Sequence, residues 1–244
     1  MRKFTLLMSV AFAAMAAPAF AQTAPQDDAA ADSGEIIVTA TRRSESLSDV
    51  PLAVSAVTSE SLQNSGANDI RSLNQLAPSL LVSSTGSEAN GSARIRGVGT
   101  VGDNPGLESS VAVFVDGVYR SRSGAGMNEM GEVERIEVLR GPQGTLFGRN
   151  ASAGLIHIIS KKPSFDFGAN VEASYGNYDY YRIAGGVTGP ISEKIAARVD
   201  GVYSKRDGFY NDANNNRSVN TRDRYFVKGQ ILFESNKATE SIEP

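Results

Sequence analysis

The feature that most constrains the fold is a series of four long segments after residue 168 in which apolar and polar residues alternate. One face carries Val171, Ala173 and Tyr175; Tyr181, Ile183, Gly185 and Val187; Ile195, Ala197, Val199, Gly201 and Tyr203; and Tyr225, Val227, Gly229, Ile231 and Phe233. The opposite face carries Arg182, Arg198, Asp200, Ser204, Lys228 and Gln230. Alternation with a period of two predicts β-strands that have one apolar and one polar face.

Two architectures fit this alternation. Strands of about ten residues with short and long connections are typical of a membrane β-barrel whose apolar side chains face lipid. A soluble antiparallel sheet with one wet face has the same alternation and is the commoner structure. The pattern alone therefore leaves both architectures open.

The first residues have the three parts of a secretory signal peptide. Arg2 and Lys3 are basic, residues 4–17 are mostly apolar, and residues 19–21 have the small-x-small pattern that signal peptidase requires. The apolar run is shorter than the ~20 residues that a membrane-spanning helix needs. We therefore expect cleavage after Ala21 and export from the cytoplasm.

Composition excludes several classes of site. The 27 acidic and 24 basic residues give no positive excess, which argues against a nucleic-acid partner. The chain has no cysteine, so disulfides and thiolate metal sites are excluded. Its one histidine, His157, leaves no histidine cluster for zinc, and on an apolar strand it is expected to be a core side chain. We expect no cofactor and no metal.

A short β-branched run follows a polar, flexible-looking tail at residues 22–33. Residues 35–41 read Glu-Ile-Ile-Val-Thr-Ala-Thr and lie between Gly34 and a polar run at residues 42–49. Such residues favour extended backbone. A lone strand can pair with the sheet edge of a partner, or it can be the first strand of the following domain. The pattern favours neither.

The middle of the chain predicts a small α+β domain that is rich in glycine. Helical patterns span residues 59–64 and 69–76. Strand patterns span Leu80–Ser83, Ala93–Arg96, Val111–Tyr119, Val133–Leu139 and Leu155–Ser160. Residues 111–115 are apolar on both faces, which predicts a central strand.

Several of these stretches resemble the TonB-dependent outer-membrane receptors. Residues 35–41 look like a TonB box. Residues 94–97 (Arg-Ile-Arg-Gly), 113–118 (Val-Phe-Val-Asp-Gly-Val), 136–150 and 153–163 resemble the plug domain of that family, and the run from Ile136 to Pro163 is long and specific. His157 stands where the family usually has asparagine.

The resemblance implies an α+β plug domain followed by antiparallel strands of an incomplete transmembrane β-barrel. The expected parts are a signal peptide (1–21), a flexible segment with the TonB box (22–43), the plug (44–163) and the first four or so barrel strands (164–244). In this family a barrel of about 22 strands encloses the plug. The implied location is the outer membrane, in contact with lipid, and the implied role is uptake of a scarce nutrient rather than catalysis. The substrate is most often a ferric siderophore or a similar small iron chelate.

The resemblance also implies roles for particular residues. The segment expected to pair with TonB, here named the coupling segment, comprises Glu35, Ile36, Ile37, Val38, Thr39 and Ala40. The plug motifs comprise Arg94, Arg96, Gly97, Asp116, Gly117, Arg140, Gly141, Pro142, Gly144, Phe147, Gly148, Arg149, Asn150 and Gly154. Charged residues expected to contact the polar barrel interior are Arg96, Glu132, Glu134, Arg135, Glu137 and Arg140.

A dinucleotide-binding motif is the main signal that we reject. Residues 97–102 fit G-x-G-x-x-G, and Asp116 lies at a suitable distance downstream. The motif requires a helix to begin at its third glycine, but residues 103–106, Asp-Asn-Pro-Gly, would break a helix. We expect a loop at the substrate-facing end of the plug instead.

Four strands cannot close a barrel around a plug, because lipid does not tolerate open strand edges. We therefore expect a fragment or a truncated protein that cannot transport by itself. The alternative is a soluble periplasmic plug-like protein that binds TonB. A signal transducer is not expected, since residues 22–34 are too few for an extra domain before the coupling segment. The sequence does not identify the substrate.

Overall fold

The computed structural model describes residues 35–67, 69–84, 91–100, 107–121, 130–215 and 217–234. The chain divides into two units, residues 1–35 and 36–244. The fold below is that of the second unit. The predicted signal peptide and the tail at residues 22–33 lie outside the described residues.

A five-stranded sheet, here named the central sheet, forms the core of the first part. Its strands are β3 (Val54–Thr58), β9 (Val133–Arg140), β10 (Gly154–Ser160), β7 (Val111–Val115) and β8 (Val118–Arg120), in that spatial order. β10 pairs parallel with β7 and antiparallel with β9. The central strand predicted at residues 111–115 is confirmed, but the longer strand predicted to residue 119 turns back at Asp116 and Gly117, which have φ of 49° and 78°.

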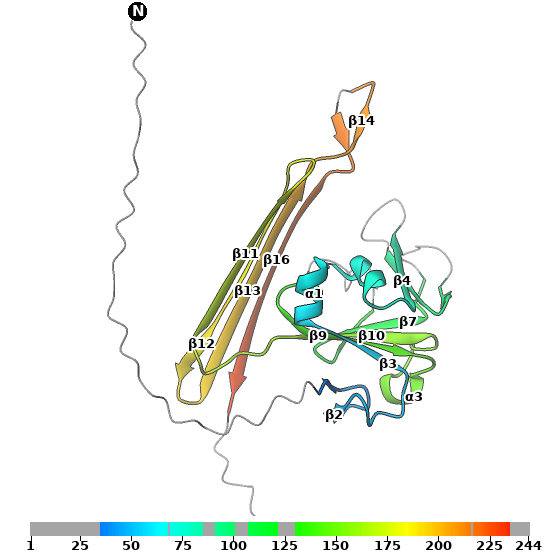
Figure 1. The fold of residues 1–244 in the computed structure, drawn as a ribbon, viewed down its shortest axis with the longest axis vertical. Coiled ribbons are helices and arrows are strands. Elements are labelled where there is room, and N and C mark those ends of the chain that lie inside the picture. Colours follow the sequence, from blue (N-terminus) through cyan, green and yellow to red (C-terminus); the bar gives the residue numbers. More distant parts are fainter. Residues whose placement is uncertain are drawn as a thin grey trace, which may run out of the picture. The chain divides into compact units, whose positions relative to one another are not determined.

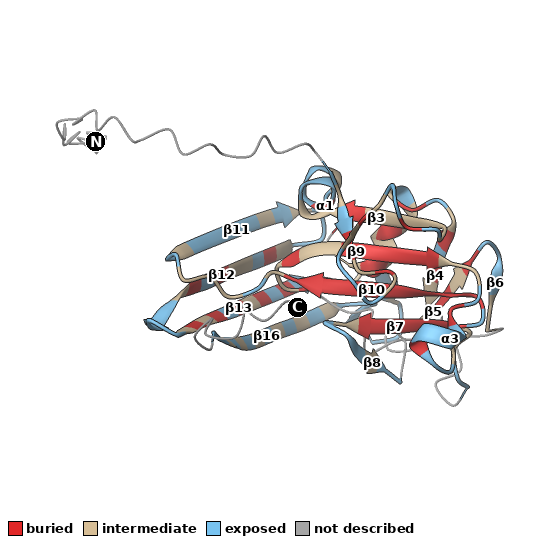
Figure 2. Cartoon of the chain, turned by 90° about the horizontal axis from the view of Figure 1, so that it is seen from below, coloured by how far each residue is buried: buried red, intermediate tan, exposed pale blue. Residues whose placement is uncertain are grey.

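Both faces of the central sheet are covered, and buried residues concentrate along β9, β10 and β7 (Figure 2). One face packs against α1 (Ser59–Ser65), η1 (Ile70–Gln75), β4 (Leu80–Ser84) and β5 (Gly91–Ile95). The second face packs against residues 36–52 and the short helix α3 (Gly144–Phe147). Two-sided cover explains why these strands read as continuous apolar runs rather than as alternating ones.

The two predicted helices form, with one change of type. α1 begins after its N-cap Thr58, whose hydroxyl accepts from the Ser61 N–H at 3.3 Å. The second helix, capped by Asp69, is a 3₁₀-helix. Its apolar positions 70, 73 and 76 repeat every three residues, which matches the three residues per turn of a 3₁₀-helix.

Two small antiparallel sheets complete this part of the chain. β4 and β5 pair with each other, and β5 also pairs with β6 (Val98–Gly99). β1 (Ile37–Val38) pairs with β2 (Glu45–Ser46). The loop expected at residues 97–102 therefore contains a short strand, and its last two residues lie outside the described ranges.

The four alternating segments form one antiparallel sheet, here named the long sheet, whose strands run side by side (Figure 1). They are β11 (Gly168–Gly176), β12 (Tyr180–Ser192), β13 (Ile195–Arg206) and β16 (Arg222–Phe233). Within the connection that precedes β16, β14 (Tyr210–Asp212) pairs with β15 (Arg217–Val219). This hairpin was not predicted from the sequence.

The long sheet buries its polar face and exposes its apolar face. Arg198 and Asp200 are 6% and 1% exposed, whereas Val171 and Tyr225 are 82% and 84% exposed. A soluble sheet does the reverse, because apolar surface in water is unfavourable. The inverted pattern therefore favours the membrane-barrel alternative over the soluble sheet. Among the residues that the structure describes, no helix is long and apolar enough to cross a membrane.

Gly154 offers a test of the packing between β9 and β10. Its φ is +144°, and an added Cβ would collide with the Leu139 carbonyl oxygen and lie 2.7 Å from Ile95 Cδ1. We expect Gly154→Ala to lower the free energy of unfolding by about 2 kcal/mol or more. Urea unfolding of the chain followed by circular dichroism measures this change. Gly144→Ala, where an added Cβ meets nothing within 4 Å, is the control. An equal effect of both substitutions would contradict the packing argument.

Candidate functional site

Residues 36–40 of the coupling segment are docked on the second face of the central sheet. Val38 is 0% exposed and Ala40 is 1% exposed, and both pack in a cluster with Phe114, Leu139 and Phe147. Burying a valine side chain stabilises the docked state by about 1.5–3 kcal/mol. The predicted strand forms at Ile37–Val38, but its partner in this structure is β2 of the same chain.

A buried carboxylate holds the docked segment. Glu137 of β9 is fully buried and accepts from the Thr39 N–H at 2.7 Å and from the Thr39 hydroxyl at 3.1 Å. Arg135 Nε donates to the same carboxylate at 2.8 Å. A hydrogen bond to a charged group contributes about 1.5–3 kcal/mol, and an unsatisfied buried charge costs more. Glu137 therefore favours a docked Thr39.

His157 lies beside Glu137 in the register of β9 and β10. Its Nε2 accepts from the Gly117 N–H at 3.1 Å, and its Nδ1 is 3.9 Å from Glu137 Oε2. Burial lowers the pKa of His157 below its ordinary value of 6.5, and the Glu137 carboxylate opposes this only in part. The ring is therefore neutral at neutral pH, as expected for a core histidine.

The turn between β7 and β8 joins the central sheet to the long sheet. Asp116 accepts from the Ser160 N–H at 2.8 Å and forms an ion pair with Lys228 of β16, whose Nζ also donates to Ser160 Oγ at 2.6 Å. Burial of Asp116 raises its pKa, but Lys228 and the Ser160 N–H outweigh this and hold the pKa below its ordinary value of 3.8. The turn is thus anchored to the long sheet by an ionised pair.

A second connection lies at the start of β9. Glu132 forms ion pairs with Arg198 of β13 and, at 3.2 Å, with Lys161. Arg198 Nε also donates to Asp200 at 3.0 Å. Side chains on the polar face of the long sheet therefore bind charged partners at the edge of the α+β part.

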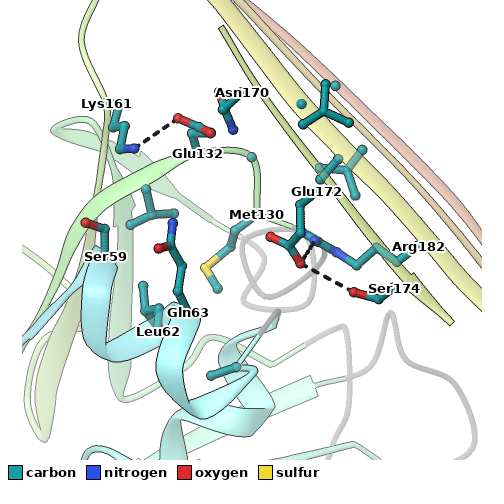
Figure 3. Close-up of a pocket in the computed structure, with 18 of the residues that line it drawn as sticks. Ser59, Leu62, Gln63, Met130, Glu132, Lys161, Asn170, Glu172, Ser174 and Arg182 are labelled. Carbon is teal, nitrogen blue, oxygen red and sulfur yellow. Dashed lines mark hydrogen bonds and ion pairs between the residues drawn. The ribbon is translucent and has the colours of Figure 1, made fainter. Parts of the chain in front are cut away.

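A cavity of about 540 Å³ lies between α1 and the long sheet (Figure 3). Ser59, Leu62 and Gln63 line it from α1, and Glu172 and Arg182 line it from β11 and β12. Arg182 donates to Glu172 at 3.0 Å. Apolar side chains, among them Leu62 and Met130, line the cavity in about the same measure as polar ones.

Most residues of the sequence motifs shape turns rather than one ligand site. Arg96 and Gly97 occupy the β5–β6 turn with positive φ, and residues 141–150 connect β9 to β10 through α3. Asn150, at φ 67°, donates to the Tyr119 hydroxyl at 2.7 Å. Arg149 pairs with Glu108 at 3.3 Å on the surface. Arg94, on β5, is half-buried.

Of the six charged residues expected to contact the barrel interior, Glu132 pairs with Arg198 on the polar face of the long sheet. The described contacts of the other five lie within the α+β part or at its surface, and their expected role stays a prediction. Glu137 is buried within the α+β part, and Arg135 pairs with Glu134 and Glu137 there. Arg140 Nε donates to the Ala53 carbonyl at 3.3 Å. Arg96 is exposed in its turn. Sequence reasoning missed Lys228 as a partner of Asp116, although its place on a polar strand face was a usable signal.

Comparison with known proteins identifies the α+β part. Residues 46–155 match the TonB-dependent receptor plug domain. This chain carries the plug domain of a TonB-dependent receptor. β3, β7 and β9 of the plug fall in the matched range, which ends within β10. The expected domain boundaries at residues 43/44 and 163/164 stay predictions.

Curated relatives belong to the same class. The chain is 30% identical over 198 residues to the pesticin receptor of Yersinia pestis, covering 79% of this chain and 28% of the relative. It is 28% identical over 220 residues to the ferrioxamine B receptor of Salmonella typhimurium, covering 84% and 29%. An iron-regulated outer membrane virulence protein of Vibrio cholerae is 28% identical over 209 residues, with coverage of 78% and 30%. The chain thus spans less than a third of the length of these relatives.

Solved structures share the fold. The ferric yersiniabactin uptake receptor of Yersinia pestis superposes with a TM-score of 0.69 at 25% identity, covering 74% of this chain and 28% of that one. The ferripyoverdine receptor of Pseudomonas aeruginosa superposes with a TM-score of 0.69 at 24% identity, covering 85% and 27%, which supports the fold alone. The predicted family, fold class and outer-membrane location are confirmed.

The buried histidine makes plug stability depend on pH. Because the pKa of His157 is lower in the folded state, the unfolded state binds the proton more readily, and stability falls as pH drops below about 6.5. The charged groups around the ring are Glu137, Arg135, Asp116 and Arg42. The stabilisation from Asp116 is lost only near and below pH 3.8. Urea midpoints from about pH 8 to about pH 5 measure the effect of His157.

The matched variant is His157→Asn, which cannot titrate and can still accept from the Gly117 N–H. We expect this substitution to flatten the pH dependence in that range. If lowering the pH reduces the stability of the variant as much as that of the parent, His157 is not the group that makes stability depend on pH.

Proposed function

We propose that this receptor takes up a ferric siderophore, or a similar scarce iron chelate, across the outer membrane with energy delivered by TonB through the coupling segment. The observation that carries the proposal is the plug-domain match at residues 46–155, followed by strands whose apolar side chains face outward. Relatives named for ferrioxamine B and ferric yersiniabactin support an iron chelate as substrate.

The coupling segment is suited to transmit a pulling force from TonB to the plug. An extended β-branched strand can add to the sheet edge of a partner through main-chain hydrogen bonds, which require little sequence specificity. Residues 36–39 are β-branched, and Ile37 is 44% exposed. Several backbone hydrogen bonds loaded together suit the transmission of a pull to the plug.

Passage requires a closed barrel around the plug. In the long sheet, β11 and β16 are the edge strands, and lipid does not tolerate open strand edges. Uptake therefore needs a barrel that contains strands in addition to these four.

The rival proposal is a soluble periplasmic protein that binds TonB with the same segment. The exposed apolar face of the long sheet disfavours it, since side chains such as Val171 and Tyr225 would lie in water. Fractionation of cells separates the two proposals: the receptor sediments with the outer membrane, and the rival stays in the soluble periplasmic fraction.

Growth on single iron sources tests uptake and coupling together. A strain that lacks the receptor should fail to grow on one or more ferric chelates and should recover with the wild-type gene. Ile37→Pro should not restore growth, because proline removes a backbone donor from the pairing strand. Ile37→Val, which keeps a β-branched strand residue, should restore it.

All of these strains should grow equally when simple iron salts are abundant. Normal growth of the deletion strain on every chelate would contradict iron uptake as the function. Recovery with Ile37→Pro would contradict strand pairing at the coupling segment.

A further inference from the structure

A line of polar side chains connects the coupling segment to the long sheet across the plug. Its members are Thr39 of the segment, Glu137 of β9, His157 of β10, Asp116 of the β7–β8 turn and Lys228 of β16. They come from five separate elements that are as much as 189 positions apart in sequence. Each contacts the following one, except that His157 reaches Asp116 through the backbone N–H of the adjacent Gly117.

The first link holds the segment itself. Glu137 accepts from both the backbone N–H and the hydroxyl of Thr39, at 2.7 Å and 3.1 Å. The carboxylate is fully buried, so water does not replace these donors while the segment is docked. Moving Thr39 away removes two of the groups that neutralise the charge.

The second link passes through the imidazole of His157. Because Nε2 accepts from the Gly117 N–H at 3.1 Å, the neutral ring carries its proton on Nδ1. Nδ1 is 3.5 Å from the Thr39 hydroxyl oxygen and 3.9 Å from Glu137 Oε2. The position of Gly117 therefore sets the orientation of the ring edge that faces Thr39 and Glu137.

The third link fixes the turn that contains Gly117. Its neighbour Asp116 binds the Ser160 N–H with one carboxylate oxygen and Lys228 with the other. Lys228 also donates to Ser160 Oγ at 2.6 Å. One lysine of the long sheet thus holds both the turn and the end of β10, the strand that carries His157.

We propose that Glu137 and His157 are positioning residues that keep the coupling segment docked, and that Lys228 sets how firmly they do so through the turn at Asp116. The docked segment buries Val38, pairs one edge with β2 and engages the Thr39 N–H with Glu137, so pairing along the whole segment with another strand requires its release. Releasing Lys228 loosens the turn, reorients His157 and weakens the hold on Thr39. The importance of docking for energy coupling rests on the proposed function, but the docking itself does not.

Cysteine labelling measures docking directly, because the chain has no native cysteine. In a Val38→Cys background, maleimide labelling in outer membranes from cells lacking TonB should be slow. Adding Thr39→Val, which keeps the shape but loses the hydroxyl, should accelerate labelling by roughly tenfold. Adding Thr41→Val is the matched control, since the Thr41 hydroxyl donates to Glu45 at 2.9 Å and should leave the rate unchanged.

The long-sheet end is tested in the same way. Lys228→Met should accelerate labelling of Cys introduced at Val38, whereas Glu132→Gln, which breaks the ion pair with Arg198 of the long sheet, should not. Val82→Cys, buried on the opposite face of the plug, reports global unfolding and should stay slow in every variant.

Three results would overturn the proposal. Rapid labelling of the Val38→Cys parent would show that the segment is not docked. Unchanged labelling with Thr39→Val or Lys228→Met would show that the line of contacts does not control it. Equal labelling at Val82→Cys would show that release is unfolding. Labelling needs neither TonB nor a substrate, so its failure is distinct from a failure of TonB-dependent growth.

Discussion

A buried carboxylate at the middle of the central sheet constrains how the coupling segment packs on the second face of that sheet. Glu137 has no exposed surface, and its neighbours across the strands are Ala56 and His157. A buried charge is tolerated only where donors neutralise it. Arg135 supplies one donor and Thr39 supplies two, so the same requirement that stabilises the plug also fixes the coupling segment on it. The docked segment thereby supplies donors that a buried core charge requires.

Charged contacts with the long sheet follow from its inverted pattern. A sheet that turns apolar side chains outward must gather its polar side chains on the other face, where they need partners. Arg198 finds Glu132 and Lys228 finds Asp116, one pair at the start of β9 and one at the β7–β8 turn. The two pairs have different consequences, because only the second adjoins the His157 ring. The plug is thus bound to the long sheet at several points, and only the Lys228–Asp116 pair is linked to the coupling segment, through His157.

The sequence predicted the elements well wherever a simple period governed them. Strict alternation located β11, β12, β13 and β16, and a two-sided apolar run located β7. Alternation could not show whether the apolar face of the long sheet meets lipid or packs in a soluble core, because both arrangements have a period of two residues. The exposure of Val171 and the burial of Asp200 favour lipid. The β14–β15 hairpin was missed because its residues are mostly polar and show no alternation.

The candidate site was less predictable for a physical reason. Glu137 and Glu132 both look like solvated charges on a strand, yet one is the buried partner of Thr39 and the other pairs with Arg198. Which partner a charge finds depends on contacts between residues about 100 positions apart, such as Thr39 and Glu137, and no local pattern encodes these. The turn at Asp116 was recognisable as a motif, but its link to Lys228 required the fold.

The central claim is that docking on Glu137 competes with strand pairing to TonB. The most direct measurement compares the affinity of the periplasmic domain of TonB for a free peptide of residues 35–40 with its affinity for the intact receptor. The account predicts weaker binding to the receptor, because only the fraction with a released segment can pair. Equal affinity for peptide and receptor would contradict docking as a competitor, and no binding to either would contradict the assignment of the segment.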